Sequence, residues 1–326
     1  MANGRGTRKT TKKAKRLPVN RFLYFAFKVG DSKKYIDLAA CISAMNGRLY
    51  RQGRMYHVAN VTMHNTDGKV QSCKLSTLPD TYTTQAAWHA MFDAWKDQRS
   101  RVLENSIGDI SGKWSDFKVT FNKEHKTTSW LMPTDSDNIS IRGGTVVYGD
   151  GSENEWAYSS VNYTDKDGIY QTGDQIGMLG ETSTSGEYIG VINELFNARA
   201  AVMVEDPDVD PNVLKRSVIF NMNPANAELG QNSDLLQRIA VDNDIPPYNN
   251  EYPLGYDNPV GSIQGFPVRE MGITSTSVLT QTVGGFPVPL GLIEVEGITE
   301  DGNGNQIGLI IELVPGKYKG IHSEAF

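Results

Sequence analysis

Short runs of β-branched and aromatic residues, separated by turn-forming residues, recur along most of this chain. Examples are "RFLYFAFKVG" at 21–30, "RMYHVANVTMHN" at 54–65 and "KVQSCKLSTL" at 69–78. Runs of about 4–8 such residues between clusters of Gly, Pro, Asn and Asp are typical of β-strands. The pattern predicts eight or more strands, and it favours a β-sandwich over a fold of alternating strands and helices.

The runs also predict how some strands are paired and buried. Residues 21–28 are expected to be buried on both faces, and "DFKVTFNK" at 116–123 alternates as a half-buried strand does. Turn residues at 65–68 predict a hairpin between the second and third runs. A second hairpin is expected where "TEDGNGN" joins 291–298 to 306–314. Further strands are expected at "GTVVYG" (144–149), "EWAYSSVNYT" (155–164), "EYIGVINEL" (187–195) and "SVIFNMN" (217–223).

Helical periodicity is confined to a few segments. "TTQAAWHAMFDAWKDQRSRV" at 83–102, with Thr83 or Thr84 as N-cap, places five apolar side chains on one face: Trp88, Met91, Phe92, Trp95 and Val102. "SDLLQRIAVDN" at 233–243 is a second helix, and "YIDLAACISAM" at 35–45 a shorter third. We therefore predict an all-β fold: a single jelly-roll β-sandwich over 18–326, with two or three short helices in inter-strand loops. The hairpin at 291–314 conflicts with that topology, because the last two strands of a jelly roll lie in opposite sheets.

The N-terminal segment has a charge opposite to that of the remaining chain. Residues 1–16 contain no acid and seven cations, which are Arg5, Arg8, Lys9, Lys12, Lys13, Lys15 and Arg16. Subtracting those seven from 32 basic residues leaves 25 against 38 acidic ones, a net charge of −13 for the remainder. Residues 1–17 are predicted to be a flexible, disordered basic arm, since between Met1 and Leu17 no large apolar side chain is present to pack.

The arm is the motif with a clear chemical mechanism. Lys and Arg neutralise phosphates and release condensed counterions, so all seven cations are candidate nucleic-acid-binding residues. No aromatic residue is present for base stacking, so base preference is expected to be slight. "KKAKR" also matches the pattern read by nuclear import receptors, through Lys12, Lys13, Lys15 and Arg16. The alternative is a solubilising tail.

The other sequence patterns provide little evidence for a catalytic, metal-binding or membrane-spanning segment. Cys41 and Cys73 are interpreted as two buried thiols, with a single disulfide left open. The charge-free stretch 271–293 contains Gly284, Gly285, Pro287 and Pro289, which favours buried strands and turns over a membrane helix, so no membrane insertion is expected. The histidines show no metal-ligand spacing, and nucleotide-binding and hydrolase motifs are absent. No cofactor is expected, and the protein is predicted not to be an enzyme.

One acidic run resembles a cation site. "EDPDVDP" at 205–211 offers Asp206, Asp208 and Asp210, whose alternating carboxylates suit Ca²⁺. Pro211 and Ser217 stand where an EF-hand loop needs Gly and Glu. A solvated acidic loop is therefore favoured over a structural Ca²⁺ site.

Two stretches, "YIDLAACISAMNGRLYRQGRMYHV" (35–58) and "TLPDTYTTQAAWHAMFDAW" (77–95), resemble segments of the capsid proteins of circular, Rep-encoding single-stranded DNA viruses. The first contains N-x-R-x-Y-R-Q-G, and the second a Pro-containing turn before a Trp-rich helix. The resemblance implies a jelly-roll subunit, an icosahedral shell of 60 copies or a multiple, and an inward arm on packaged DNA. The arm here is shorter and less arginine-rich than is common in that family.

The expected function is therefore that of a structural capsid protein, found in the virion and, during assembly, in the host nucleus. Its expected partners are further copies of itself, single-stranded DNA and a nuclear import receptor. The coat protein of a small RNA virus remains an alternative, because phosphate binding does not read the 2′-hydroxyl. A more distant alternative is a carbohydrate-binding β-sandwich, whose sugar platforms would be Trp88, Trp95, Trp114, Trp130 and Trp156.

Overall fold

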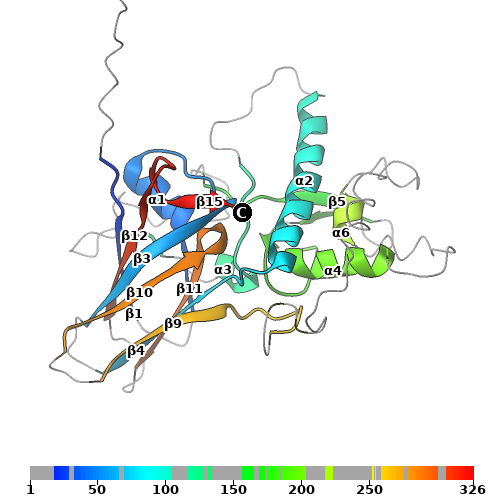
Figure 1. The fold of residues 1–326 in the computed structure, drawn as a ribbon. Coiled ribbons are helices and arrows are strands. Elements are labelled where there is room, and N and C mark those ends of the chain that lie inside the picture. The colour runs from blue at the N-terminus through cyan, green and yellow to red at the C-terminus, as the bar shows by residue number, and fades with distance from the viewer. Residues whose placement is uncertain are drawn as a thin grey trace, which may run out of the picture.

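The computed structural model describes most of the chain beyond the N-terminal arm (Figure 1). The described residues are 18–28, 33–65, 70–104, 116–127, 131–133, 156–164, 169–173, 175–183, 186–202, 217–222, 252, 254, 258–274, 278–299 and 306–326.

Two antiparallel sheets, one of five strands and one of four, form the framework of the molecule. The first has the order β1-β12-β3-β10, with a short strand β15 also pairing β3. The second has the order β2-β11-β4-β9. The first sheet consists of β1 (Phe22–Lys28), β12 (Gln306–Leu313), β3 (Arg54–Asn65), β10 (Thr280–Val288) and β15 (Ser323–Ala325). The second consists of β2 (Lys34–Asp37), β11 (Leu292–Thr299), β4 (Gln71–Thr77) and β9 (Phe266–Ile273). The fold is predominantly β, as predicted, but the expectation of two or three short helices is wrong, since the described residues contain five α-helices, of which α2 (Tyr82–Glu104) has 23 residues.

The apolar core lies between these sheets. Leu23, Phe25 and Phe27 of β1 are buried, whereas the side chains between them are half-buried. The prediction that this strand is buried on both faces is therefore wrong: only one face meets the core. The stretch 271–293 contains the end of β9, all of β10 and the start of β11, so the prediction of strands is confirmed. The prediction that they are buried is wrong for β10, most of whose residues are exposed or half-buried. No helix among the described residues is long and apolar enough to span a bilayer.

Both hairpin predictions are wrong in the same way. β3 and β4 follow each other in the chain but lie in opposite sheets, and so do β11 and β12. β11 pairs β2 and β4, while β12 pairs β1 and β3. Alternation within a run identifies a strand, but it carries no information on which strand is its partner. The conflict between the expected hairpin at 291–314 and a two-sheet topology is thereby removed.

Arg269 of β9 bridges the two sheets along one open side of the sandwich. Its Nε donates to the carbonyl of Gly284 at 3.1 Å, and its Nη2 donates to that of Gly285 at 2.8 Å, both in β10. Gly285 approaches β3 so closely that a Cβ there would lie 2.0 Å from the carbonyl oxygen of Val58. Backbone groups at the edge of a sheet otherwise remain available for pairing with another chain. The arginine satisfies two of them.

Residues 78–265, more than half of the 326, lie between β4 and β9. Their described part forms a second apolar core, which packs α2 and α4 against residues 117–121 and 176–179. Figure 1 shows these helices grouped beside one end of the sheets. The elements of this insertion are α2 (Tyr82–Glu104), α3 (Lys123–Thr127), β5 (Val161–Thr164), β6 (Tyr170–Gly173), β7 (Ile176–Gly177), β8 (Ile189–Gly190), α4 (Val191–Val202) and α6 (Val218–Asn221). Those outside it are α1 (Leu38–Asn46), η2 (Pro289–Gly291), β13 (Pro315–Gly316) and β14 (Gly320–Ile321).

Helix predictions hold better than strand predictions in this part of the chain. The helices at 35–45 and 83–102 are confirmed as α1 and α2, although α2 begins at Tyr82 and Thr81 Oγ1 accepts from the Thr84 N–H at 3.3 Å. The expected strand at 187–195 is mostly α4, and that at 217–223 is α6. The segments 144–149 and 233–243 lie outside the described residues.

Residues 116–123 are not a strand of either main sheet. Thr120 forms an isolated bridge to Gly177, and α3 begins at Lys123. Phe117, Val119 and Phe121 are buried, as alternation requires, but so are the residues between them. The segment crosses the second core, where Thr120 and Asn122 form side-chain hydrogen bonds and Lys118 lies over the ring of Trp156. The predicted half-buried strand is therefore wrong.

The carboxylate of Asp37 links the sandwich to the insertion. It ends β2 and caps α1, where Oδ1 accepts from the Ala40 N–H at 3.1 Å. Oδ2 accepts from Gln52 Nε2 and Trp156 Nε1, each at 3.1 Å, and from Tyr158 Oη at 3.4 Å. Asp37 is fully buried, and this burial raises its pKa to about 6 against the effect of these donors.

Substitution of Asp37→Ala is expected to lower the free energy of unfolding by about 2–3 kcal/mol. The change removes a helix cap and leaves the buried Trp156 N–H without its acceptor. Relief of the carboxylate's desolvation offsets part of that loss. Urea unfolding at pH 7 measures it, with Asp80→Ala as an exposed control that is expected to change little. Equal stability of the two variants would contradict a structural role for Asp37.

His125 is a buried, neutral histidine of the same joint. Its Nδ1 accepts from the Phe121 N–H at 3.0 Å, its Nε2 lies 3.3 Å from Tyr158 Oη, and its ring stacks on Tyr35 at 4.9 Å. Burial lowers its pKa to about 3. Protonation of Nδ1 would also displace the Phe121 N–H.

Acidification is therefore expected to destabilise the fold through His125. Below the unfolded pKa of about 6.5, the unfolded chain binds a proton at this histidine that the folded chain does not bind. The free energy of unfolding therefore decreases as the pH is lowered. Between pH 7.5 and 5 the loss from this group is about 2 kcal/mol. Denaturant unfolding at both pH values measures it in the wild type and in His125→Asn, whose amide oxygen replaces Nδ1 as acceptor. An unchanged pH dependence in the variant would contradict the assignment.

Candidate nucleic-acid interface

A cavity of about 920 Å³ opens beside the first described residues of the chain. Its walls come from the segment just before β1, from the residues that follow α1 and from the β13–β14 hairpin. The lining residues are Val19, Arg21, Arg48, Gly316, Lys317, Tyr318, Lys319 and Gly320. Four of these eight are cations, and none is an acid.

The hairpin owes its shape to two residues with positive φ. Lys319 has φ 50° and Gly320 φ 99°, which reverses the chain between β13 and β14. A Cβ at Gly320 would lie 2.7 Å from Val19 Cγ2, so the absence of a side chain lets the residues before β1 pack on the hairpin. The arm, residues 1–17, therefore joins the described chain at the wall of this cavity.

The other wall follows from how α1 ends. Gly47, in the left-handed conformation at φ 60°, donates its N–H to the Ser43 carbonyl and terminates the helix. Arg48 follows directly. The side chain of Asn46 fixes this end to the segment before β1, because it accepts from the Asn20 N–H at 2.9 Å and donates to the Asn20 carbonyl at 3.1 Å.

Two of the four cavity cations, Lys319 and Arg21, contact neutral groups. Lys319 Nζ donates to the Leu49 carbonyl and lies 5.6 Å from the ring centroid of Tyr50. Arg21 Nη1 is 3.5 Å from the Leu313 carbonyl. Burial raises the pKa of Tyr50, and the positive charge of Arg48 acts in the opposite direction. Because none of the lining residues is an acid, the residues that line the cavity carry a net positive charge.

Such an arrangement can bind phosphate groups but offers little for reading bases. Tyr318 is the aromatic residue of the lining, yet Arg54 lies over its ring at 4.1 Å, and its hydroxyl accepts from the Arg51 N–H at 3.1 Å. The covered ring face is not available for stacking. Phosphate contacts by cations give affinity without sequence preference.

The site residues predicted from the sequence lie outside the described residues. This applies to Arg5, Arg8, Lys9, Lys12, Lys13, Lys15 and Arg16, including the four assigned to nuclear import. It applies equally to the carboxylates of Asp206, Asp208 and Asp210. The sequence reasoning missed the cavity cations, which come from three separate segments. The local sequence "GKYKG" at 316–320 was the one available signal.

The cysteines and tryptophans of the described part are mostly buried. Cys41 and Cys73 are free thiols, as the sequence interpretation favoured, and burial raises the pKa of both. Trp88 is buried and stacks on Phe92 at 5.0 Å, and Trp156 is buried with its N–H on Asp37. Neither presents a platform for a sugar ring. Trp114 and Trp130 lie outside the described residues.

Comparison with known proteins identifies no relative: no family model, curated protein or solved structure matches the chain.

Removal of two cavity cations is expected to weaken binding of single-stranded DNA and to reduce its salt dependence. In Arg48→Ala/Lys317→Ala, the slope of log K against log salt should fall in magnitude by about 1.4, at about 0.7 for each phosphate contact on a single strand. Fluorescence anisotropy with an oligothymidine from 50 to 300 mM salt measures the slope. Lys96→Ala, an exposed lysine of α2, is the control. A slope equal to that of the control would exclude the cavity from the interface.

Proposed function

We propose that this protein is a viral capsid subunit, a jelly-roll protein that assembles into a closed icosahedral shell and packages a single-stranded DNA genome. In this proposal the basic arm, residues 1–17, contacts the enclosed nucleic acid, and the cavity at its base extends the contact. The role is structural and not catalytic. The "KKAKR" sequence would bring the subunit into the host nucleus for assembly.

The pairing of the eight main strands supports the jelly-roll part of the proposal. Numbered in chain order, the strands β1, β2, β3, β4, β9, β10, β11 and β12 are first to eighth. The first pairs the eighth, the second the seventh, the third the sixth and the fourth the fifth. Such mirror pairing is what results when one long antiparallel ribbon curls into two facing sheets, as in the double-sheet folds of capsid subunits.

The single observation that carries the functional proposal is the place where the arm joins the fold. The arm contains seven cations, and it is followed in the chain by Val19 and Arg21, which line a cavity with four cations and no acid. In this proposal the arm and the cavity act as one cationic region, while residues 17–326 as a whole, the cavity included, carry a net charge of −13. Phosphates would be attracted to this region and repelled by most of the remaining surface.

The charge of the whole shell sets how a genome can be held. About 60 copies would carry about 420 arm charges, and the cavity raises this to about 660. That is still fewer than the phosphates of a kilobase-scale genome. Metal ions or polyamines would have to supply the remaining neutralisation.

Electron microscopy of the full-length protein beside a variant lacking residues 1–16 tests the proposal. Negative-stain images show whether closed particles form, and the ratio of absorbance at 260 and 280 nm shows whether they contain nucleic acid. We expect closed particles from both proteins, with nucleic acid only in the full-length sample. Monodisperse monomers from both, across salt and pH, would overturn the capsid proposal.

The nature of the packaged nucleic acid decides between the two kinds of virus. Nucleic acid extracted from nuclease-treated particles is digested separately with DNase and RNase. Degradation by DNase alone is expected. Degradation by RNase alone would favour the coat protein of an RNA virus, whose basic arm binds phosphates equally well.

A further inference from the structure

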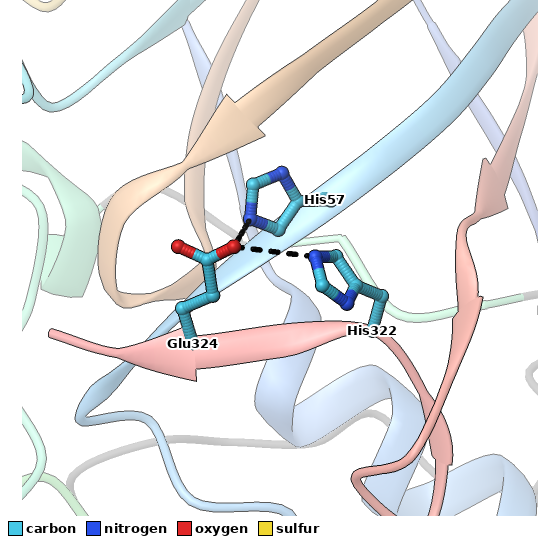
Figure 2. A group of neighbouring side chains, drawn as sticks. All are labelled: His57, His322 and Glu324. Carbon is cyan, nitrogen blue, oxygen red and sulfur yellow. Dashed lines mark ion pairs between the residues drawn. The ribbon is translucent and has the colours of Figure 1, made fainter.

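Two histidines far apart in the sequence meet on the outer side of the first sheet. His57 lies in β3, and His322 immediately precedes β15, which contains Glu324. Figure 2 shows the three side chains converging, with both imidazoles directed at the same carboxylate oxygen. His57 Nε2 is 3.7 Å and His322 Nε2 is 3.3 Å from Glu324 Oε1.

The backbone of the sheet fixes this meeting point. The Val314 N–H donates to the His57 carbonyl at 3.0 Å, and the Val314 carbonyl accepts from the His322 N–H at 2.7 Å. Glu324 is the register partner of Met55 in the pairing of β15 with β3. A Cβ at Gly316 would lie 2.4 Å from the Cα of His322, so the hairpin packs tightly behind the second histidine. Two of the ligand side chains, His57 and Glu324, are thus carried by strands, and His322 lies directly between β14 and β15.

The contacts within the cluster leave one buried polar atom unsatisfied. His57 Nε2 is buried and has no hydrogen-bond partner, because its 3.7 Å separation from the carboxylate exceeds hydrogen-bond distance. The imidazole rings lie 4.6 Å apart and tilted at 44°, so neither ring nitrogen serves the other. An electron-pair acceptor between the three groups would satisfy this nitrogen.

The spacing suits a metal ion. The two ring nitrogens and the carboxylate oxygen all lie within 4.8 Å of one another. Ligands of a tetrahedral ion at bond lengths of about 2.0–2.2 Å stand about 3.3–3.5 Å apart, so a small contraction brings the set into range. The exposed carboxylate of Glu324, at 59% side-chain exposure, is free to make that adjustment. Two imidazoles with one carboxylate favour a transition metal over Ca²⁺ or Mg²⁺.

We propose that His57, His322 and Glu324 form a binding site for a divalent transition-metal cation of the Zn²⁺ class, with a fourth position open to water. The guanidinium of Arg54, another residue of β3, is engaged by other partners, because it donates to the Oγ and the carbonyl of Ser323 at 2.7 and 3.1 Å and lies over the ring of Tyr318. The site does not depend on the proposed capsid function.

Metal binding there would stabilise the pairing of the C-terminal strand β15 with β3. β15 has three residues, and the chain ends two residues beyond Glu324 at Phe326, which packs in the second core at 6.0 Å from Trp88. A metal joining β15 to β3 would therefore stabilise the contact between the sandwich and the insertion.

The other histidines do not compete for the ion. All five of the chain lie within the described part, where this cluster is the one group of three ligand side chains within reach of each other. His125 is committed on both nitrogens to Phe121 and Tyr158. His64 lies on the same strand as His57 without joining such a group, which makes it a matched control.

The test is a Zn²⁺ titration of the full-length protein after removal of metal with EDTA. Competition with a chromophoric zinc chelator should give one ion per chain, and free Zn²⁺ at about 100 times its Kd should raise the Tm by about 5 °C. His322→Gln and Glu324→Gln should each weaken binding at least tenfold and abolish the rise in Tm, whereas His64→Gln should bind as the wild type. Co²⁺ should show the absorption of a tetrahedral site.

Glu324→Gln keeps the hypothesis testable if other variants fold poorly, because its side chain is exposed and nearly isosteric. Its Tm in EDTA should equal that of the wild type. No stoichiometric binding by the wild type would overturn the site. Wild-type affinity in both His322→Gln and Glu324→Gln would do so as well, as would an equal loss in His64→Gln.

Discussion

The arrangement of the whole molecule depends on one buried carboxylate. Asp37 ends β2, caps α1 and accepts hydrogen bonds from Gln52 and from Trp156 and Tyr158 of the insertion. A carboxylate can be kept inside a protein only when donors surround it, because burial otherwise costs several kcal/mol. Its four donors come from three parts of the chain. The need to satisfy this group therefore fixes the sandwich, α1 and the insertion relative to one another.

A sandwich with mirror pairing tolerates the large insertion for a physical reason. β4 and β9 pair as neighbours although residues 78–265 separate them. The entropy cost of closing a loop grows only slowly with its length, and the insertion contributes a core of its own. α1, η2, the β13–β14 hairpin and the start of β1 all emerge at the same end as the insertion. The cationic cavity and the proposed metal site consequently lie at the end of the sandwich that carries the helices, the hairpin and the insertion. The opposite end carries four short connections, which join β1 to β2, β3 to β4, β9 to β10 and β11 to β12.

Several predictions followed directly from local patterns, and others failed for identifiable reasons. The strands around Phe25, Val61 and Leu309 were predicted from runs of β-branched and aromatic residues between turn residues, and the helices α1 and α2 from helical patterns, because both signals depend only on residues close together in the chain. Residues 187–195 were predicted to be a strand, but only Ile189–Gly190 form one, and α4 begins at Val191. Nearly all of residues 188–195 are buried in the insertion, so their apolar pattern shows no helical period. The cationic arm was evident from composition alone. The cavity was not, since its cations become neighbours only when α1, the hairpin and the start of β1 meet.

The sequence by itself determined that this chain is mostly β, that an acidic body follows a cationic arm, and that its two cysteines stay apart from any disulfide framework. These properties depend on composition and on residues close together in the chain. The tertiary structure alone decided which strands pair, that β11 and β12 separate into different sheets, and that His57 meets His322 beside Glu324. Those outcomes depend on the burial of apolar faces and the satisfaction of buried polar groups between distant segments. No local pattern carries such information, because the free energy of these contacts exists only once the sheets have formed.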